Sequence, residues 1–593
     1  MTTLVEPELQ VTGPIPQSHK WSNALFCVPP IALIIGLLAL HASSVSHIGN
    51  YGLIQAVSHW YYLGVGLVIV GFVLALQARY QRTLLLSLHL AVFVFLLHGA
   101  PGVIESEPRF ATAWLHAGFT NYVATHGAFL PLLDARFSWP SFFGGVGLLD
   151  RAAGISSAVS LIRWWPVAMN LLYLPFIFQI ARQLLANDTM AWVATGLFPI
   201  MNWVGQDYFS PQSVGMLLYL AFVYLLIGPL GGDGMPVWTW LRRHRESRWP
   251  DPVAPPGSAG LDVRFLIGCA LLVMVAMATG HQLSPVMACG SAVILVAAGR
   301  TRIRYLAVAC VLITLGWVFY GAVSFWGGHP GELFGQIGAV SSNLTRAVAK
   351  RLHGTAPHQF IVDARLVMSA FVWLMGLGGA IRWRGTRSGR SVAFLLMAWP
   401  IGLLGLQSYG GEALLRIYLF SLPGAVCLAS SLLFSLRAPI RSIATGMVLA
   451  LLVPLFMFAR WGNEIFEYVR PDAIAGVEHL YDIAPPGSTL VSITPQIPWL
   501  FKDLNIYHYE PSNLDEFALR QIVPIERLFQ KYPGTDRGYV IITIDQVLYG
   551  WQEYGLPENW GTQVEHLLET SKSFELVYTN PDTFIFKYVP HGR

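Results

Sequence analysis

Charge is the feature that this sequence has least of. Only 12% of its 593 residues are Asp, Glu, Lys or Arg, whereas 54% are hydrophobic. Soluble globular proteins carry about 25% charged residues, so this chain has too few to cover a surface in contact with water. A wholly soluble protein is therefore excluded, and most of the chain is expected to face lipid. The basic residues are spread over short loops and the formal net charge is only +4, which argues against a nucleic-acid-binding protein.

Cysteine is scarce as well, and its placement favours neither disulfides nor metal binding. The five cysteines lie in apolar runs without metal-ligand spacing, at Cys27, Cys269, Cys289, Cys310 and Cys427. No cluster of metal ligands stands out elsewhere, so a metal is not required, and a divalent cation (Mg²⁺ or Mn²⁺) stays open as a cofactor. The first apolar run lacks a small-residue cleavage site, which argues against a cleavable signal peptide.

What the sequence does have is a series of long apolar runs between residues 22 and 459. About thirteen of them approach the ~20 residues that a helix needs to cross a bilayer, and the run at 189–204 is the weakest. The runs lie at 22–42, 60–77, 83–99, 164–184, 189–204, 211–228, 264–280, 284–299, 303–325, 366–382, 391–407, 416–434 and 440–459. They predict a polytopic α-helical membrane protein whose membrane domain is 22–459.

Arginines mark alternate loops between these runs and thereby set the orientation. The basic loops carry Arg79, Arg82, Arg182, Arg242, Arg243, Arg245, Arg248, Arg300, Arg302, Arg304, Arg382, Arg384, Arg387, Arg390, Arg437 and Arg441. The opposite short loops contain neither Lys nor Arg. By the positive-inside rule the basic loops are cytoplasmic. An odd number of spans then places the tail 1–21 inside, and the long loops 100–163 and 326–365 outside the plasma (inner) membrane.

Residues 460–593 have the composition of an ordinary soluble domain. Strand patterns occur at 489–493, 539–544, 574–578 and 583–588, and an Asn580-Pro581-Asp582 turn joins the last two. Helical patterns lie near 472–484, 514–530 and 560–570. The sequence therefore predicts a small extracytoplasmic α/β domain after the membrane domain.

The outer ends of the spans collect ionisable residues, and charge at membrane depth is costly enough that each is a candidate functional group. They are Glu105, Glu107, Arg109, Asp134, Arg136, Asp207, His281, Glu412 and Arg416. Aromatic residues accompany most of them, and loop 100–163 has so many that short interfacial helices are expected there. Such a group suits a transferase with an anionic lipid-linked donor. A carboxylate deprotonates the attacking hydroxyl, guanidiniums hold the phosphate, and aromatic faces pack against sugar rings.

Four strings in these outer segments carry a resemblance to a known family. They are DARFSWP (134–140), QDYFSPQ (206–212), GHQLSP (280–285) and GGEALLR (410–416). With them the chain resembles the GT-C superfamily of integral-membrane glycosyltransferases over roughly residues 80–480, and most closely the actinobacterial-type members acting on cell-envelope or exported polysaccharide. The resemblance implies a polyprenyl-phosphate sugar donor, inversion at the anomeric carbon, and an acidic base in the first large outer loop. Two extra spans precede that loop here, which departs from the common pattern.

The candidate site residues combine this resemblance with the outer-rim pattern. Candidates for the catalytic base are Asp134, Glu107, Asp207 and Glu105; for the donor phosphate, Arg416, Arg109, Arg136 and His281; and for sugar or acceptor, Trp114, Trp139, Tyr208 and Glu412. Structural alternatives accompany each. They are an ion pair of Asp134 with Arg136 or Arg109, solvated loop acids for Glu105 and Glu107, helix capping by Asp207, a turn cap by His281, an i,i+4 salt bridge between Glu412 and Arg416, and interfacial anchoring by the aromatics.

The predicted function is transfer of a sugar from a polyprenyl-phosphate carrier to an acceptor glycan or glycolipid on the extracytoplasmic face. The alternatives are a glycan polymerase or ligase, a lipid-linked-glycan transporter, and a non-catalytic membrane scaffold. A transporter predicts charges near mid-span and repeat symmetry. The charges here lie at the outer rim and no repeat is visible, so the transferase is the first hypothesis.

Overall fold

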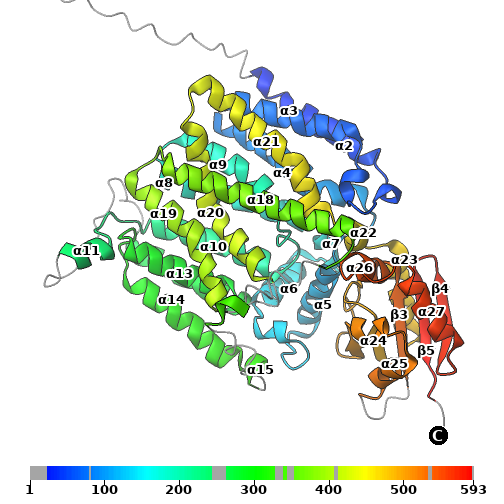
Figure 1. Cartoon of the computed structure of the whole chain (residues 1–593). Helices are drawn as coiled ribbons and strands as arrows, with labels where there is room; N and C mark the ends of the chain where they lie inside the picture. Colours follow the sequence, from blue (N-terminus) through cyan, green and yellow to red (C-terminus); the bar gives the residue numbers. More distant parts are fainter. Residues whose placement is uncertain are drawn as a thin grey trace, which may run out of the picture.

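The computed structural model describes residues 23–78, 82–243, 262–327, 338–342, 353–406, 412–531 and 537–590. The predicted tail 1–21 and the loop residues Arg79, Arg245 and Arg248 lie outside this described part. The helices form one large bundle, and a small domain of strands and helices lies beside one end of it (Figure 1). The prediction of a helical membrane protein with a C-terminal α/β domain is confirmed.

Eight helices in the described part are long and apolar enough to cross a membrane. They are Asn23–His41 (which includes α2, Val28–His41), α4 (Arg82–Ile104), α8 (Trp165–Leu185), α12 (Val263–Gly280), α18 (Ala356–Ile381), Ser388–Gly405 (α19, Arg387–Ala398, continued by η5, Trp399–Gly405), α20 (Ala413–Phe434) and α21 (Ala438–Trp461). Four shorter apolar helices accompany them: α3 (His59–Ala75), α10 (Pro211–Ile227), α13 (Ser284–Ala297), and Tyr305–Gly321, in which α14 (Tyr305–Gly316) runs into η4 (Trp317–Gly321). Each coincides with a predicted span.

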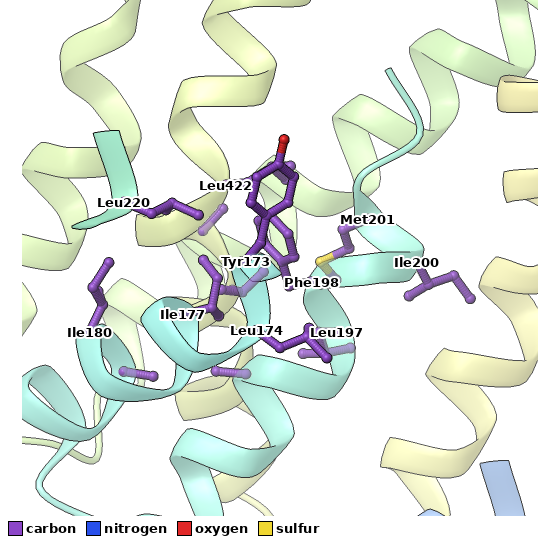
Figure 2. Packing of buried hydrophobic residues seen from close by; sticks show 14 of the residues in the cluster. Tyr173, Leu174, Ile177, Ile180, Leu197, Phe198, Ile200, Met201, Leu220 and Leu422 are labelled. Atoms are coloured by element: carbon purple, nitrogen blue, oxygen red, sulfur yellow. The ribbon is translucent and has the colours of Figure 1, made fainter. Parts of the chain in front are cut away.

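The predicted span 189–204 is α9 (Asp188–Met201), a helix at the centre of the bundle. Its side chains from Met190 to Met201 are all buried, and α8, α20 and α21 pack around it. Figure 2 shows the apolar contact between α8 and α9, where the Tyr173 and Phe198 rings meet edge-on with centroids 6.0 Å apart. With 14 residues, α9 is shorter than the ~20 residues that a full crossing needs. The count of thirteen spans therefore stays a prediction.

Basic loops from different parts of the chain meet at one end of the bundle. Arg82, at the start of α4, donates to the Thr189 hydroxyl at the start of α9. Arg182, near the end of α8, pairs with Asp188 at 3.1 Å. The opposite ends of α4 and α9 lead to the outer loops described below. These two basic loops thus share a side, as the positive-inside rule predicts, and the assignment of that side to the cytoplasm stays a prediction.

Two loop limits differ from the sequence prediction. Helix α18 begins at Ala356, after the N-cap residue Thr355, so the loop predicted to run to residue 365 ends earlier. Arg365 continues the helix, and its Nε–H donates to the Ala459 carbonyl at 2.8 Å. Similarly, α4 continues through Pro101 to Ile104, so the first outer loop begins at residue 105 rather than 100.

The first outer loop contains the short helices that its aromatic content predicted. They are α5 (Ala111–His126), η3 (Ala135–Ser138), α6 (Ser141–Ala153) and α7 (Val159–Ile162). Phe119, Phe137 and Phe143 lie at the centre of a separate buried cluster, with ring centroids 4.5–5.8 Å apart. The aromatics therefore give this loop a hydrophobic core of its own.

The C-terminal domain is built on a five-stranded sheet in the order β2-β1-β3-β5-β4. Strand β1 (Thr489–Ser492) is parallel to β2 (His508–Glu510) and β3 (Gly538–Thr543), and β5 (Thr583–Tyr588) is antiparallel to β3 and β4 (Phe574–Asn580). The helices are α22 (Glu464–Glu467), α23 (Pro471–Ile483), α24 (Leu514–Ala518), α25 (Ile522–Phe529), α26 (Ile544–Gln552) and α27 (Trp560–Thr570). All four predicted strands are present. Strand β2 was missed because its three residues form no apolar run, and the helix predicted at 514–530 is interrupted at Arg520, which has a φ of +53°.

The C-terminal domain docks on α5 through a close backbone contact at Gly118. A Cβ atom at this position would lie 1.8 Å from the Leu500 carbonyl oxygen and 2.8 Å from the Phe501 Cα. On the same helix, the Trp114 ring meets the Phe501 ring edge-on at 5.4 Å. Only glycine therefore lets the two backbones approach this closely.

Replacing Gly118 by Ala is expected to loosen this docking. Alanine is favoured within a helix by about 0.8–1.0 kcal/mol, but the added methyl group collides with a carbonyl that no rotamer change can move. Hydrogen exchange of residues 497–504 should become faster, measured by mass spectrometry in detergent. The matched control is Gly145→Ala in α6, where an added Cβ meets nothing within 4 Å. Equal exchange in both variants would contradict the contact.

Candidate functional site

Residues from all four sequence strings line one cavity of about 240 Å³, which we call the arginine cavity. Its wall comes from η3 and its flanks, the turn between α9 and α10, the turn between α12 and α13, and the first turn of α20. The lining residues include Arg136, Trp139, Gln206, Tyr208, Ser210, Gln212, His281, Gln282 and Arg416, together with His116, Thr112 and Phe325. The ends of helices far apart in the sequence thus converge at one site.

The two arginines of this cavity are each held by a carboxylate outside its wall. Arg136 makes two bonds to Asp134, with Nε and Nη2 at 2.8 and 2.7 Å from the carboxylate oxygens. Asp134 also caps η3 by accepting the Arg136 backbone N–H at 2.8 Å. Arg416 donates to Glu412 at 2.7 Å and to the Gln206 side-chain carbonyl. Both ion pairs that the sequence offered as structural alternatives are therefore present, and their guanidiniums face the cavity.

The two histidines of the cavity are neutral and carry their protons on different nitrogens. Burial, together with the Arg416 charge, lowers the pKa of His281 to about 3. Its Nδ1 accepts the Ser284 backbone N–H at 3.1 Å, so the proton lies on Nε2. Burial and the Arg136 charge likewise lower the pKa of His116 to about 3. Its Nδ1–H donates to the Phe209 carbonyl at 3.0 Å, which leaves Nε2 as an acceptor.

A smaller apolar cavity of about 90 Å³ adjoins the arginine cavity, and we call it the side cavity. The two share Trp139, Gln282 and Phe325 in their walls. The rest of the side cavity is almost entirely apolar and comes from α13, η4, α15 (Val323–Trp326) and η5. A ligand with a polar head and a hydrocarbon chain fits this pair of spaces.

A third and larger cavity of about 460 Å³ lies on the other side of the Glu412–Arg416 ion pair. Glu412 lines this large cavity, whereas Arg416 lines the arginine cavity. The wall of the large cavity also includes Trp203, Trp373 and, from the C-terminal domain, Glu553. Aromatic rings combined with carboxylates suit a polyhydroxyl ligand.

Asp207 does not line any of these three cavities. Its side chain is 2% exposed and pairs with Arg460, 1% exposed, at 2.7 Å. His98 Nδ1 lies 3.3 Å from the other carboxylate oxygen, and Asn170 donates to the same oxygen. Although burial favours the neutral acid, the Arg460 charge and His98 hold the pKa of Asp207 well below its usual range. Asp207 is thus a closed ion pair between the α9–α10 turn and the end of α21.

Glu105, Glu107 and Arg109 lie together at a different place, around a narrow space of about 20 Å³. Arg109 makes two bonds to Glu464 at 2.7 and 2.9 Å and also pairs with Glu467. Burial and the Glu464 charge raise the pKa of Glu105 well above its usual range. Arg109 thus ties the first outer loop to α22, and none of the three residues lines the arginine cavity.

The aromatic candidates divide in the same way. Trp139 and Tyr208 line the arginine cavity, and the Tyr208 ring stacks on His116 with centroids 5.7 Å apart. Trp114 is buried in the contact with the C-terminal domain, where its Nε1–H donates to the Pro108 carbonyl at 2.8 Å. Gln206, Gln212 and Arg460 escaped the sequence prediction. The two amides carry no charge to mark them, and Arg460 follows directly on an apolar run.

Metal ligands do not gather at the site in the part of the chain described. No three His, Cys, Asp or Glu side chains lie close enough to hold an ion there. All five cysteines are free thiols.

Comparison with known proteins finds solved structures but no sequence relatives. Neither a protein-family model nor a curated protein matches the chain. Among solved structures, ArnT from Cupriavidus metallidurans bound to undecaprenyl phosphate aligns with 86% of this chain and 99% of its own, at 11% identity and a TM-score of 0.48. The oligosaccharyltransferase AglB from Archaeoglobus fulgidus, in complex with an inhibitory peptide and a dolichol-phosphate, aligns with 84% of this chain and 72% of its own, at 11% identity and a TM-score of 0.43.

Proposed function

We propose that this protein is a membrane glycosyltransferase that moves a sugar from a polyprenyl-phosphate donor to an acceptor glycan or glycolipid on the extracytoplasmic face. One observation carries the proposal. Two arginines, Arg136 and Arg416, line a cavity that adjoins a second, almost entirely apolar one. A phosphate with a long hydrocarbon chain is the ligand whose chemistry matches both spaces.

The donor phosphate would lie between Arg416 and Arg136, with the start of its isoprenoid chain in the side cavity. Neither guanidinium needs to move far, because Glu412 and Asp134 already hold them in place. Such preorganised charge stabilises the negative charge that appears on the phosphate as the sugar leaves. Arg109 would not take part, because Glu464 and Glu467 occupy it.

The acceptor would enter the large cavity, and Glu412 would act as the base. Glu412 lines that cavity and is bonded to the arginine that lines the proposed donor space, so it would stand between the two substrates. Among the other candidate bases, Asp207 lies in a closed ion pair with Arg460. The narrow space beside Arg109 is lined by Glu105 and Glu107, and Asp134 caps η3. Asp134 would instead position Arg136.

The reaction would be a single inverting displacement. Glu412 takes the proton of the acceptor hydroxyl as its oxygen attacks the anomeric carbon from the face opposite the phosphate. The bond between the anomeric carbon and the phosphate oxygen breaks at the same time, and its electron pair leaves with the phosphate. The products are polyprenyl phosphate, held by the arginines, and a glycosidic bond of inverted configuration.

The proposal is tested with purified full-length protein in lipid nanodiscs. The donors are polyprenyl-phosphate sugars that carry a label in the sugar. A panel of cell-envelope polysaccharide fragments serves as acceptors. We expect release of polyprenyl phosphate that depends on an acceptor, and loss of this release in Arg416→Gln. A labelled donor that crosses the bilayer of a proteoliposome unchanged would support a transporter instead. Absence of both release and transport across the panel would leave the scaffold hypothesis and overturn the transferase.

A further inference from the structure

Gln212 is a buried polar side chain of the arginine cavity that the mechanism above does not use. It belongs to the first turn of α10 and is 3% exposed. Neither its Oε1 nor its Nε2 has a hydrogen-bond partner among the residues that the structure describes. An unsatisfied buried polar group costs roughly 1–3 kcal/mol, so a side chain with two of them is expected to meet a ligand.

Helix capping does not explain this side chain. The first turn of α10 is already capped by Ser210, whose side chain accepts the Ser213 backbone N–H at 3.4 Å. Gly215 lies three residues after Gln212 and therefore on the same face of the helix. A Cβ on Gly215 would lie 2.3 Å from the Ser284 Oγ and 3.5 Å from the His281 Cβ. The face of α10 that carries Gln212 thus packs against the turn between α12 and α13, which contains His281.

The polar groups of the arginine cavity fall into two chemical sets. Arg136 and Arg416 are cationic and suit a phosphate. Gln212, His281 and His116 are neutral, and together they offer amide and Nε2–H donors beside amide and Nε2 acceptors. Hydroxyl groups, which both donate and accept, match this neutral set. Among the described residues no carboxylate lines the cavity, so none stands ready to pair with an amino sugar.

We infer that Gln212 recognises the sugar of the donor, and that this sugar is an uncharged one bound through its hydroxyl groups. The inference rests on the proposed function and adds the class of sugar and the residue that selects it. A hydroxyl group both donates and accepts hydrogen bonds. Gln212 matches both, because its side-chain carbonyl accepts and its side-chain NH₂ donates. The arginines bind what all donors share, the phosphate, whereas Gln212 distinguishes one donor from another.

The test compares the binding of two probes to wild type and to Gln212→Leu. The first probe is undecaprenyl phosphate alone. The second is the one of undecaprenyl-phosphate glucose, galactose and mannose that wild type binds best. Dissociation constants are measured in nanodiscs. We expect the variant to bind the sugar probe about 5–150-fold more weakly, as follows from the loss of one or two buried hydrogen bonds. Binding of undecaprenyl phosphate should stay within about twofold, since the lost bonds are made by the sugar alone.

A second measurement separates recognition from a structural role. Without ligand, Gln212→Leu should raise the melting temperature, because it removes two unsatisfied buried groups. The matched control is Gln546→Leu in the C-terminal domain. Gln546 is also buried and its Nε2 has no hydrogen-bond partner among the described residues, but its Oε1 accepts the Ile493 backbone N–H at 3.0 Å. Gln546→Leu would leave that N–H unpaired, so it should lower the melting temperature and change neither dissociation constant.

Each other outcome is decisive. If Gln212→Leu weakened the binding of both probes equally, or changed the binding of neither, the role of Gln212 would be overturned. Tighter binding of undecaprenyl-phosphate glucosamine than of every uncharged sugar probe would overturn the class of sugar while leaving the transferase in place. If wild type binds neither undecaprenyl phosphate nor any sugar probe, the proposed function fails and the inference fails with it.

Discussion

Glu412→Gln is expected to lower the rate constant of sugar transfer by a factor of about 10²–10⁴, the range over which a general base contributes. Glutamine keeps the shape of the side chain, and its amide oxygen can still accept the bond that Arg416 donates at 2.7 Å. Donor binding should therefore be nearly unchanged. The effect should appear in kcat measured with saturating donor and acceptor, because the residue loses its capacity to take a proton and little else.

The matched control is Asp134→Asn, which removes a carboxylate from the other cavity arginine. Asp134 lines none of the three larger cavities and bonds to Arg136 from behind the wall. We expect a higher KM for the donor, with kcat within about tenfold of wild type. The opposite pattern, in which Glu412→Gln stays active and Asp134→Asn does not, would return the role of base to the acid of the first outer loop.

The sequence predicted most of the membrane fold because lipid imposes a simple rule on it. A span must be apolar over about 20 residues, and the backbone must satisfy its own hydrogen bonds, so the helices can be read directly from the runs. The exception is informative. Helix α9 is as apolar as its neighbours, but it is short and buried on all sides by protein. Composition does not distinguish burial in protein from contact with lipid.

The sequence predicted that residues of the four strings converge, whereas the roles of the individual residues stay predictions. The four strings do meet at one cavity, since each occupies the outer end of a helix. The direction of a side chain at such an end is set by partners that the sequence does not place nearby. Asp207 lies between two residues of the cavity wall, Gln206 and Tyr208, yet points to Arg460. Gln212 stands in a quoted string, but an uncharged amide gave no reason to choose it.

Asp207→Asn is expected to destabilise the whole protein. Removing one partner of a buried ion pair commonly costs about 3–5 kcal/mol, because the remaining charge is left in a medium of low polarity. That partner is Arg460, 1% exposed, whose Nη2 donates to Asp207 and whose Nε and Nη1 have no hydrogen-bond partner among the described residues. The loss would be a large fraction of the roughly 5–15 kcal/mol that usually separates native from unfolded protein. We therefore expect a marked fall in melting temperature and in the monodisperse fraction on size exclusion in detergent.

Two companion variants test whether the buried charge of Arg460 causes the loss of stability in Asp207→Asn. Asp134→Asn makes the same chemical change in a partly exposed pair, where about 0–1 kcal/mol is at stake, so its melting temperature should stay near that of wild type. Asp207→Asn combined with Arg460→Met should recover part of the lost stability, because no uncompensated charge then remains inside the bundle. If Asp207→Asn instead melted like wild type and lost only sugar transfer, Asp207 would act in catalysis. The Asp207–Arg460 pair would then be a resting arrangement that opens when substrates bind.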